Sequence, residues 1–384
     1  MSLPSTCEVV VIGGGVMGAS TAYHLLQAGL RDVVLLEKES YFGQGATGRC
    51  AGGVRYQFAT EVNVRLSIAS LGMIEHFKAE TGQDPLYRRC GYLFVITQPE
   101  DVSTFKRNIA MQNTLGVPTE WLDAESVRGR VPMMRFDDAL GGSWHADDGL
   151  SDPNSIVMGY IKRFRDLGGT ALTDEAVTAI GVDSGRITSV STPSGTVSCG
   201  SVVNAAGPWM GLIGQMVGIE IPIQPIRRQM VTTTPLPELP ADFPFVIDFS
   251  RSLYFHREGE GILTGMSNPK EQPGFDQSID EEWELIAMEA AAERLPMLNQ
   301  AGRLAGWAGL YEVTPDAHPI FGPSPVEGFW LVGGFSGHGF MHGPVAGKLM
   351  AEFLTRGQAT TVDVSMLDLA RFEEGRLIHE YNVV

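Results

Sequence analysis

The sequence predicts a mixed α/β fold, with parallel strands near the N-terminus and antiparallel strands later in the chain. The apolar run Val9–Ile12 is bounded by glycine, as a buried parallel strand should be, and a helical pattern and a second apolar run follow it. Residues 171–204 contain short β-prone runs joined by the turn sequences VDSG and TPSG. Further strand patterns lie between residues 226 and 266, before two helical patterns.

Residues 1–37 are expected to form one βαβ unit. Apolar side chains repeat at helical spacing over residues 16–28, Gly29 stands where a C-capping glycine belongs, and Val33–Leu36 is the second strand. The first strand and the helix are joined by GGGVMG, residues 13–18, which fits G-x-G-x-x-G. In this context we expect a Rossmann-type dinucleotide site rather than a glycine-rich turn without a ligand.

Each part of that motif has a physical task. Gly13 permits the tight turn, Gly15 lets a pyrophosphate approach the backbone, and Gly18 lets the helix pack closely on the strand. The helix N-terminus offers N–H groups and partial positive charge to the phosphates. Glu37 ends the second strand, where it can accept hydrogen bonds from ribose hydroxyls and would repel a 2′-phosphate. NADP is therefore disfavoured.

The remaining elements are predicted in chain order. Residues 38–60 are glycine-rich and irregular, residues 61–80 and 100–116 are helical, and Tyr92–Thr97 is a strand. The runs Ala171–Ile180, Arg186–Ser191 and Thr196–Cys199 predict a β-meander that leads into the strand Ser201–Asn204. RQMVTTT, SLYFHRE and GILTGM predict strands, Asp280 an N-cap for a helix to about residue 295, and Pro344 the first turn of a helix over residues 344–355.

Length, charge and cysteine usage limit the possible functions. A chain of 384 residues is long enough for two domains or two intergrown lobes. A net charge of −17 argues against electrostatic binding of nucleic acid or an anionic membrane. The four cysteines are scattered and form no C-x-x-C pair, which disfavours a metal site and favours a reducing, cytoplasmic location. The N-terminal apolar run is too short for a signal or a membrane span.

The segment GGFSGHGFMHGP, residues 333–344, contains five glycines and precedes a helical pattern. So many glycines let a rigid ligand approach the main chain closely. An ordinary glycine-rich loop that caps a helix is the alternative reading of this segment alone. A nicotinamide-binding domain would continue with βαβ units after residue 37, whereas this chain has a meander, a late strand ending in NAAGPW and this remote segment. The layout therefore favours FAD over NAD.

Five stretches spread along the chain carry a more specific resemblance. They are VVVIGGGVMGASTAYHLLQAG with VVLLEKE, GATGRCAGGVR, VVNAAGPW, GLYEVTPDAHPIFG and GGFSGHGFMHGPVAG. Through them the chain resembles the D-amino-acid oxidase/sarcosine oxidase family of FAD-dependent amine oxidoreductases. It is most similar to the branch of the sarcosine oxidase and proline dehydrogenase β-subunits.

The resemblance implies a p-hydroxybenzoate-hydroxylase-like fold. A Rossmann-type FAD-binding domain with a β-meander is interleaved with an antiparallel-sheet substrate domain. The implied segments are residues 1–85, 145–225 and 306–384 for the FAD-binding domain, and residues 86–144 and 226–305 for the substrate domain.

The implied cofactor is non-covalent FAD, whose ring lies against GFSGHGF. A helix N-terminus there would stabilise negative charge that develops at the edge of the ring. His338 could hydrogen-bond near the flavin, although a structural role is the simpler one for His338 and His342. The expected cofactor-binding residues are Gly13, Gly15, Val16, Met17, Gly18, Glu37, Lys38, Thr47, Arg49, Gly52, Gly53, Val177, Ala205, Ala206, Gly207, Trp209, Gly334, Gly337, His338, Gly339, Phe340 and Met341.

The resemblance also implies the chemistry. An amino acid or secondary amine, similar to proline, sarcosine or a D-amino acid, would lose hydride from the carbon beside its nitrogen to flavin N5, and the imine would hydrolyse. Tyr311 stands at the substrate-facing position of the family, and Arg55 falls near the flavin face. Tyr254 and His256 are candidates for the roof of the substrate cavity, as is Arg227.

Several departures from the family pattern bear on the reaction. Gly309 replaces the cysteine that attaches FAD in monomeric sarcosine oxidases, and Asp152 replaces the histidine that attaches FMN in heterotetrameric ones. Met341 and Leu263 replace the lysines that hold the carboxylate and activate oxygen. These changes favour a dehydrogenase that passes electrons to another carrier or partner subunit. The alternatives are an NAD-dependent dehydrogenase and a non-catalytic flavin-binding assembly or scaffold subunit.

Overall fold

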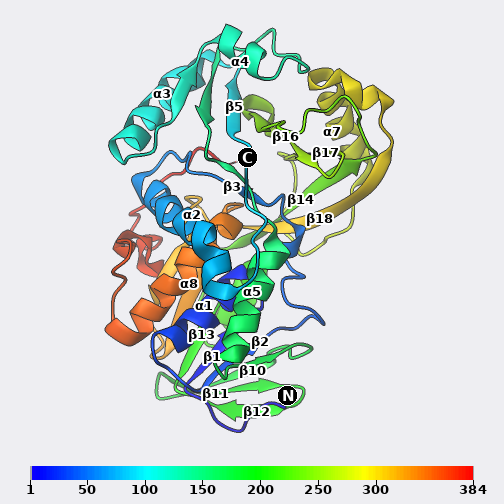
Figure 1. Cartoon of the computed structure of the whole chain (residues 1–384). Coiled ribbons are helices and arrows are strands. Elements are labelled where there is room, and N and C mark those ends of the chain that lie inside the picture. Colours follow the sequence, from blue (N-terminus) through cyan, green and yellow to red (C-terminus); the bar gives the residue numbers. More distant parts are fainter. Residues whose placement is uncertain (1, 384) are drawn as a thin grey trace.

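Two parts that share one chain make up the protein in the computed structural model, which describes residues 2–383. The lower part of Figure 1 contains helices α1 (Val16–Gln27), α5 (Pro153–Asp166) and α8 (Gly339–Arg356), packed around a mainly parallel sheet. The upper part contains a mainly antiparallel sheet with its own helices. The colours alternate between the parts because the chain crosses from one to the other several times.

The sheet of the lower part has the strand order β19-β20-β13-β1-β2-β9. All neighbouring strands pair in parallel except β19, which is antiparallel to β20. The predicted βαβ unit is confirmed, and β13 lies beside β1 although the two are distant in the sequence. The strands are β1 (Val9–Ile12), β2 (Val33–Leu36), β9 (Thr170–Leu172), β13 (Ser201–Asn204), β19 (Ile320–Pro323) and β20 (Phe329–Gly333).

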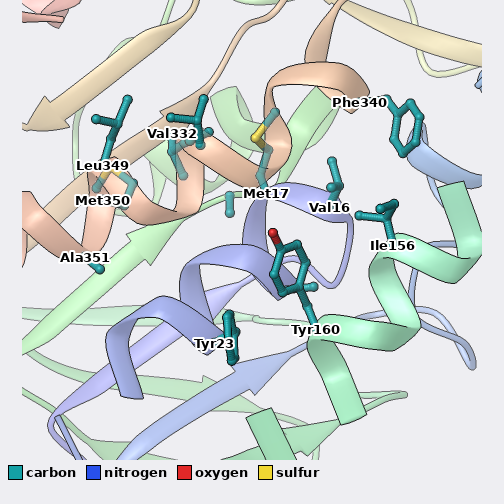
Figure 2. Close-up of a cluster of buried hydrophobic side chains, with 14 of the residues drawn as sticks. Val16, Met17, Tyr23, Ile156, Tyr160, Val332, Phe340, Leu349, Met350 and Ala351 are labelled. Atoms are coloured by element: carbon teal, nitrogen blue, oxygen red, sulfur yellow. The ribbon is translucent and has the colours of Figure 1, made fainter. Parts of the chain in front are cut away.

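Alternate residues of the central strands face opposite sides of this sheet. Val9 and Val11 belong to a core that includes α1, α5 and α8, whereas Val10 and Ile12 belong to a core with the β-meander. Figure 2 shows the first core, where Tyr23 of α1 lies beside Tyr160 of α5 with ring centroids 5.3 Å apart. Burial on both faces explains why these strands are apolar runs without polar alternation.

The sheet of the upper part has the order β18-β14-β17-β16-β15-β5-β7-β6 and is antiparallel except between β15 and β5. Val246 of this sheet shares a core with Val127 of α4 and Ala291 of α7. The strands are β5 (Tyr92–Ile96), β6 (Glu120–Leu122), β7 (Gly141–His145), β14 (Gln224–Thr233), β15 (Phe245–Asp248), β16 (Leu253–Glu258), β17 (Gly261–Met266) and β18 (Arg303–Val313).

Within residues 2–383, two smaller sheets and five further α-helices complete the set of sheets and α-helices. The small sheets are β3-β8-β4 (Gly53–Val54, Gly149–Leu150, Arg88–Arg89) and the meander β10-β11-β12 (Ala179–Asp183, Arg186–Thr192, Gly195–Ser198). The helices are α2 (Glu61–Thr81), α3 (Pro99–Thr114), α4 (Ala124–Arg130), α6 (Met210–Gln215) and α7 (Glu281–Arg294). The predicted cap of α7 is present, since the Asp280 side chain accepts a hydrogen bond from Trp283 N at 3.0 Å.

Two predicted elements have different boundaries in the structure. The run Ala171–Ile180 is not one strand of the meander, because β9 ends at Leu172 and the backbone turns at Asp174, whose φ is +57°. The last helix begins at Gly339, after Ser336 and Gly337 with φ of +49° and +100° and the N-cap residue His338. Pro344 therefore lies inside α8 and not in its first turn. Its missing N–H costs the helix one hydrogen bond there.

Several elements were not predicted from the sequence, among them α4, α5, β7 and β20. The division into five domain segments stays a prediction. Within residues 2–383, no helix has the length and apolar character that crossing a bilayer requires.

Candidate active site

The glycine motif lies at the carboxyl end of β1, where the first turn of α1 begins. Gly13 has a φ of +107°, and a Cβ there would clash with the carbonyl oxygen of Ala205 at the end of β13. A Cβ on Gly18 would clash with the carbonyl oxygen of Gly13, so this glycine serves close packing. Gly15 is different, because its absent side chain would face only Thr47 and the cleft beside it.

A large cleft opens beside this motif. Its space free of protein atoms, including open solvent at its entrance, is about 1360 Å³. The expected cofactor residues that line it are Gly13, Gly15, Val16, Met17, Glu37, Lys38, Thr47, Val177, Ala205, Ala206, Gly207, Trp209, Gly337, Gly339 and Phe340. Chain segments from both ends of the sequence therefore form one site.

Charged groups at the mouth of the large cleft are fixed by local contacts. Glu37 accepts hydrogen bonds from Gly14 N at 2.6 Å and Glu39 N at 2.8 Å, while burial raises the pKa of its carboxyl group. The Lys38 ammonium lies 3.9 Å from the centre of the Trp209 ring. At the N-terminus of α1 the N-cap residue Gly15 has no side chain, the first turn contains no acid, and Val16 N donates to the neutral Thr47 Oγ1 at 3.1 Å. No acidic residue of the helix therefore offsets the partial positive charge that it could offer to an anion.

A second helix end faces the opposite part of the cleft. Helix α8 also starts without a side-chain cap or an acid in its first turn, and Gly339 and Phe340 of that turn line the cleft. A Cβ on Gly337 would clash with the ring of Tyr311, so the glycine-rich segment lies directly on that tyrosine. The glycines thus allow close backbone packing and leave the partial positive charge of α8 pointing at the site.

A smaller cavity adjoins the large cleft. Its space free of protein atoms, including open solvent at its entrance, is about 820 Å³. The residues that line both are Ala46, Cys50, Leu310, Tyr311, Gly337 and Phe340. Arg49, Gly52, Gly53, His338 and Met341, which we expected at the cofactor, line the smaller cavity only. Gly18 and Gly334 line neither of them.

Three of the four expected catalytic residues border the smaller cavity, namely Arg55, Tyr254 and Tyr311. His256 does not, because it is buried and packs against Phe245, with ring centroids 5.1 Å apart. Its Nδ1 lies 3.1 Å from the carbonyl oxygen of Arg257. Burial raises the pKa of Tyr254 and of Tyr311, so both phenols are protonated at neutral pH.

The smaller cavity is basic although the whole chain is acidic. Three arginines and no aspartate or glutamate stand among the described residues that line it. The Arg55 guanidinium is buried over the Phe58 ring, donates to the carbonyl oxygens of Gln57 and Asn382, and forms no ion pair within residues 2–383. Burial lowers its pKa. A buried cation without a carboxylate partner favours an anionic ligand.

His338 is buried in the same wall, and neither of its ring nitrogens has a hydrogen-bond partner among the described residues. Burial lowers its pKa well below the usual value, so the imidazole is neutral. His342 does not line either cavity; its Nε2 lies 2.9 Å from Ser67 Oγ. The expected structural role therefore suits His342 better than His338.

Sequence reasoning missed three features of the site. Arg228 lines the smaller cavity, whereas the candidate Arg227 pairs with Glu271 at 3.2 Å and lies outside the lining. Glu312, directly after Tyr311, is buried in the lining of the large cleft. Strand alternation on β14 was the signal for Arg228, because Arg228 and Met230 both line the cavity. Alternation on β18 gave no such signal for Glu312, because the consecutive residues Leu310, Tyr311 and Glu312 all line the large cleft.

The C-terminal segment is the third missed feature. Val383 lines the smaller cavity, and Glu380 accepts hydrogen bonds from Ala59 N at 2.8 Å and Thr60 N at 3.2 Å. Asn63 Nδ2 donates to the same carboxylate at 3.0 Å. No composition or motif signal in the last residues pointed to this role.

Comparisons with known proteins agree with this geometry. Residues 8–353 match the family described as FAD dependent oxidoreductase (DAO). Dimethylglycine dehydrogenase from Rattus norvegicus is 32% identical over 95% of this chain and 45% of its own length. Sarcosine dehydrogenase from Mus musculus is 28% identical over 98% of this chain and 42% of its own length. The chain thus spans about half the length of these relatives or less.

The crystal structure of L-proline dehydrogenase from P. horikoshii is 34% identical, with a TM-score of 0.90 over 98% of this chain and 100% of that one. The predicted mixed α/β fold class and FAD as the family cofactor are confirmed, and no comparison supports the NAD alternative. The two clefts, the uncapped helix ends and these matches lead to one conclusion: the chain belongs to the FAD dependent oxidoreductase (DAO) family.

Proposed function

We propose that this protein oxidises the bond between carbon and nitrogen in a small amine that carries a carboxylate. The observation that carries the proposal is the arginine-lined cavity, which has no acid among its described lining residues and adjoins the large cleft at Tyr311. Such a cavity would hold the carboxylate and leave the nitrogen and its neighbouring carbon beside Tyr311, where the cavity meets the large cleft. The names of relatives that act on dimethylglycine, sarcosine and proline support the same substrate class.

The residues present fit FAD in the large cleft. Gly13 and Gly15 and the positive end of α1 would hold the pyrophosphate, and Glu37 would accept hydrogen bonds from the ribose. The N-terminus of α8 would face the isoalloxazine ring. When bound there, FAD supplies the acceptor for the hydride that leaves the substrate carbon.

Side chains of the smaller cavity would bind and orient the amine. Arg55 would hold the carboxylate, and the phenol groups of Tyr254 and Tyr311 would contact the substrate from the sheet side. Phe245 and Ile247 add apolar wall, which disfavours an ammonium and so favours the free amine that can lose hydride. Neutral His338 offers one hydrogen-bond acceptor and adds no charge that would repel a protonated amine.

The proposal includes non-covalent attachment of FAD. Cys50 is the one cysteine among the described residues that line either cavity, and burial raises its pKa to about 12, so its thiol is not nucleophilic at neutral pH. Gly309 contributes no side chain that could form a bond. Transfer of electrons to a partner subunit and a cytoplasmic location also belong to the proposal, the latter supported by four free cysteines.

Anaerobic titration of the purified holoprotein tests the proposal. Proline, sarcosine, dimethylglycine and D-amino acids are added in turn, and loss of the oxidised flavin spectrum is recorded. We expect at least one of them to reduce the flavin, and Arg55→Met to raise its KM. A flavin that stays oxidised with every compound would contradict the proposal and favour the assembly or scaffold alternative.

A further inference from the structure

Strand β14 carries two adjacent arginines whose surroundings differ completely. Arg227 forms ion pairs with Glu271 at 3.2 Å, Asp276 at 3.1 Å and Asp280 at 3.9 Å, outside the cavity. Arg228 points to the other face of the strand, as alternation requires, and lines the smaller cavity together with Met230. Neighbouring residues of β14 therefore face opposite sides, and only the second arginine borders the cavity.

The N–H groups of Arg228 are only partly used. One terminal nitrogen donates to the carbonyl oxygen of Arg227 at 3.0 Å, whereas the buried Nε has no partner among the described residues. Its guanidinium carbon lies 5.3 Å from the centre of the Tyr311 ring. No acidic side chain of residues 2–383 lies within ion-pair distance of it, in contrast to the three acids around Arg227. Arg228 is thus a cation that lines the cavity without a carboxylate partner among the described residues, and its guanidinium has the shape that pairs with a planar anion.

Arg228 and Arg55 line the same smaller cavity but come from different parts of the fold. Arg55 follows β3 and rests on Phe58, whereas Arg228 comes from the antiparallel sheet. Both positive charges favour ionisation of the Tyr311 phenol, although burial outweighs them and raises its pKa. The cavity thus holds more cationic charge than the single carboxylate of sarcosine or proline would neutralise, because Arg49 lines it as well.

We propose that Arg228 forms a second anion subsite, and that the preferred substrate is an amino acid with two carboxylates, one at Arg55 and one at Arg228. This inference rests on the proposed function, because it assigns a substrate class to the same cavity. Phe245 and Ile247 line the same cavity and would provide apolar wall for the carbon atoms of such a substrate. The donor pattern of a guanidinium suits a carboxylate best.

Pairs of ligands that differ only by a second carboxylate measure the contribution of that carboxylate to binding. Iminodiacetate is sarcosine with a carboxylate on its methyl group, and the pair glutarate and butyrate reproduces this difference without an oxidisable amine. The holoprotein, Arg228→Met, Arg228→Lys and the control Arg227→Met are compared. Turnover of the first pair gives kcat and KM, and calorimetric titration of the second pair gives Kd without any turnover.

We expect iminodiacetate to have a lower KM than sarcosine, and glutarate to bind more tightly than butyrate. Loss of a charge-assisted hydrogen-bond pair should make Arg228→Met raise the iminodiacetate KM and the glutarate Kd by about 10- to 100-fold. The sarcosine KM and butyrate Kd should change by less than about threefold on the same reasoning, because Arg55 still holds one carboxylate. Arg228→Lys should restore part of the loss, and Arg227→Met should change neither pair.

Equal effects of Arg228→Met on both members of each pair would overturn the inference and make Arg228 the anchor of a single carboxylate. Equal binding of glutarate and butyrate to the unmodified holoprotein would overturn it as well. Flavin that no amine reduces, with glutarate binding still dependent on Arg228, would instead contradict the proposed function and leave the subsite standing. The two failures are therefore distinguishable.

Discussion

Glu312 makes the stability of the cofactor-free protein fall as the pH rises. Its side chain is buried in the large cleft, where Oε1 accepts a hydrogen bond from Phe335 N at 3.2 Å and Oε2 has no partner among the described residues. Burial raises the pKa of its carboxyl group from 4.5 to about 7, against the opposing effect of backbone N–H groups. The ionised form is therefore costly in the folded state.

The sign follows from proton linkage. Below pH 4.5 Glu312 is protonated in both states; as the pH rises towards 7 the unfolded chain releases its proton first, and stability falls. The contribution is fully present below pH 4.5 and is lost as the pH rises through 7. The shift of 7 − 4.5 = 2.5 units corresponds to about 3 kcal/mol. Glu312→Gln removes this loss, so the variant should gain up to about 3 kcal/mol over the unmodified protein between mildly acidic and mildly alkaline pH.

Urea unfolding of the cofactor-free protein, measured at several pH values across that range, tests this reasoning. The quantity to compare is the difference in unfolding free energy between Glu312→Gln and the unmodified chain, because other titrating groups cancel in it. Glu373→Gln is the control, since Glu373 is exposed and outside both cavities. A difference for Glu312→Gln that does not change with pH would refute the claim that the buried carboxyl ionises at the expense of stability.

Three further predictions concern packing and binding. Gly18→Ala should lower the unfolding free energy by about 1–3 kcal/mol, because its Cβ would clash with Gly13 O; an unchanged urea midpoint would contradict this close packing. Glu380→Ala should cost about 2–4 kcal/mol in the same assay, because it leaves the partly buried N–H groups of residues 59 and 60 and the buried amide of Asn63 unpaired. The conservative Glu380→Gln should cost less. Gly337→Ala should weaken FAD binding at least about tenfold, because its Cβ would displace the Tyr311 ring. Flavin fluorescence titration of the cofactor-free protein measures the Kd for FAD. An unchanged Kd would show that the ring can move freely.

Local sequence patterns were enough to predict those elements whose formation depends on residues next to them in the chain. The glycine motif, the apolar runs of β1 and β2 and the Asp280 cap each stand next to the element they specify. The pairing of β13 with β1 was not readable from the chain alone, because a parallel neighbour distant in the sequence leaves no local signal. Helix α8 began earlier than its proline suggested because two left-handed residues, Ser336 and Gly337, set its start.

The residues of the candidate site also fall into those that local motifs predict and those that depend on distant contacts. Residues of contiguous motifs, such as Gly15 and Ala205, were found by spacing and context and do line the large cleft. Arg228 was missed by one position, because the inward face of a strand depends on a register that the sequence does not mark. Val383 was missed because its position depends on the bonds of Glu380 to residues some 320 positions earlier.

The account rests on a single flavin held at both ends, by the turn before α1 and by the turn before α8. Extraction of the purified protein with acid, followed by separation and quantification of the released flavin, measures this most directly when Gly15→Val and Gly337→Val are run beside the unmodified chain. We predict one FAD per chain, fully released from the denatured protein, and a large loss of FAD in both variants. A colourless protein that takes up no FAD, or full FAD content in either variant, would contradict the account.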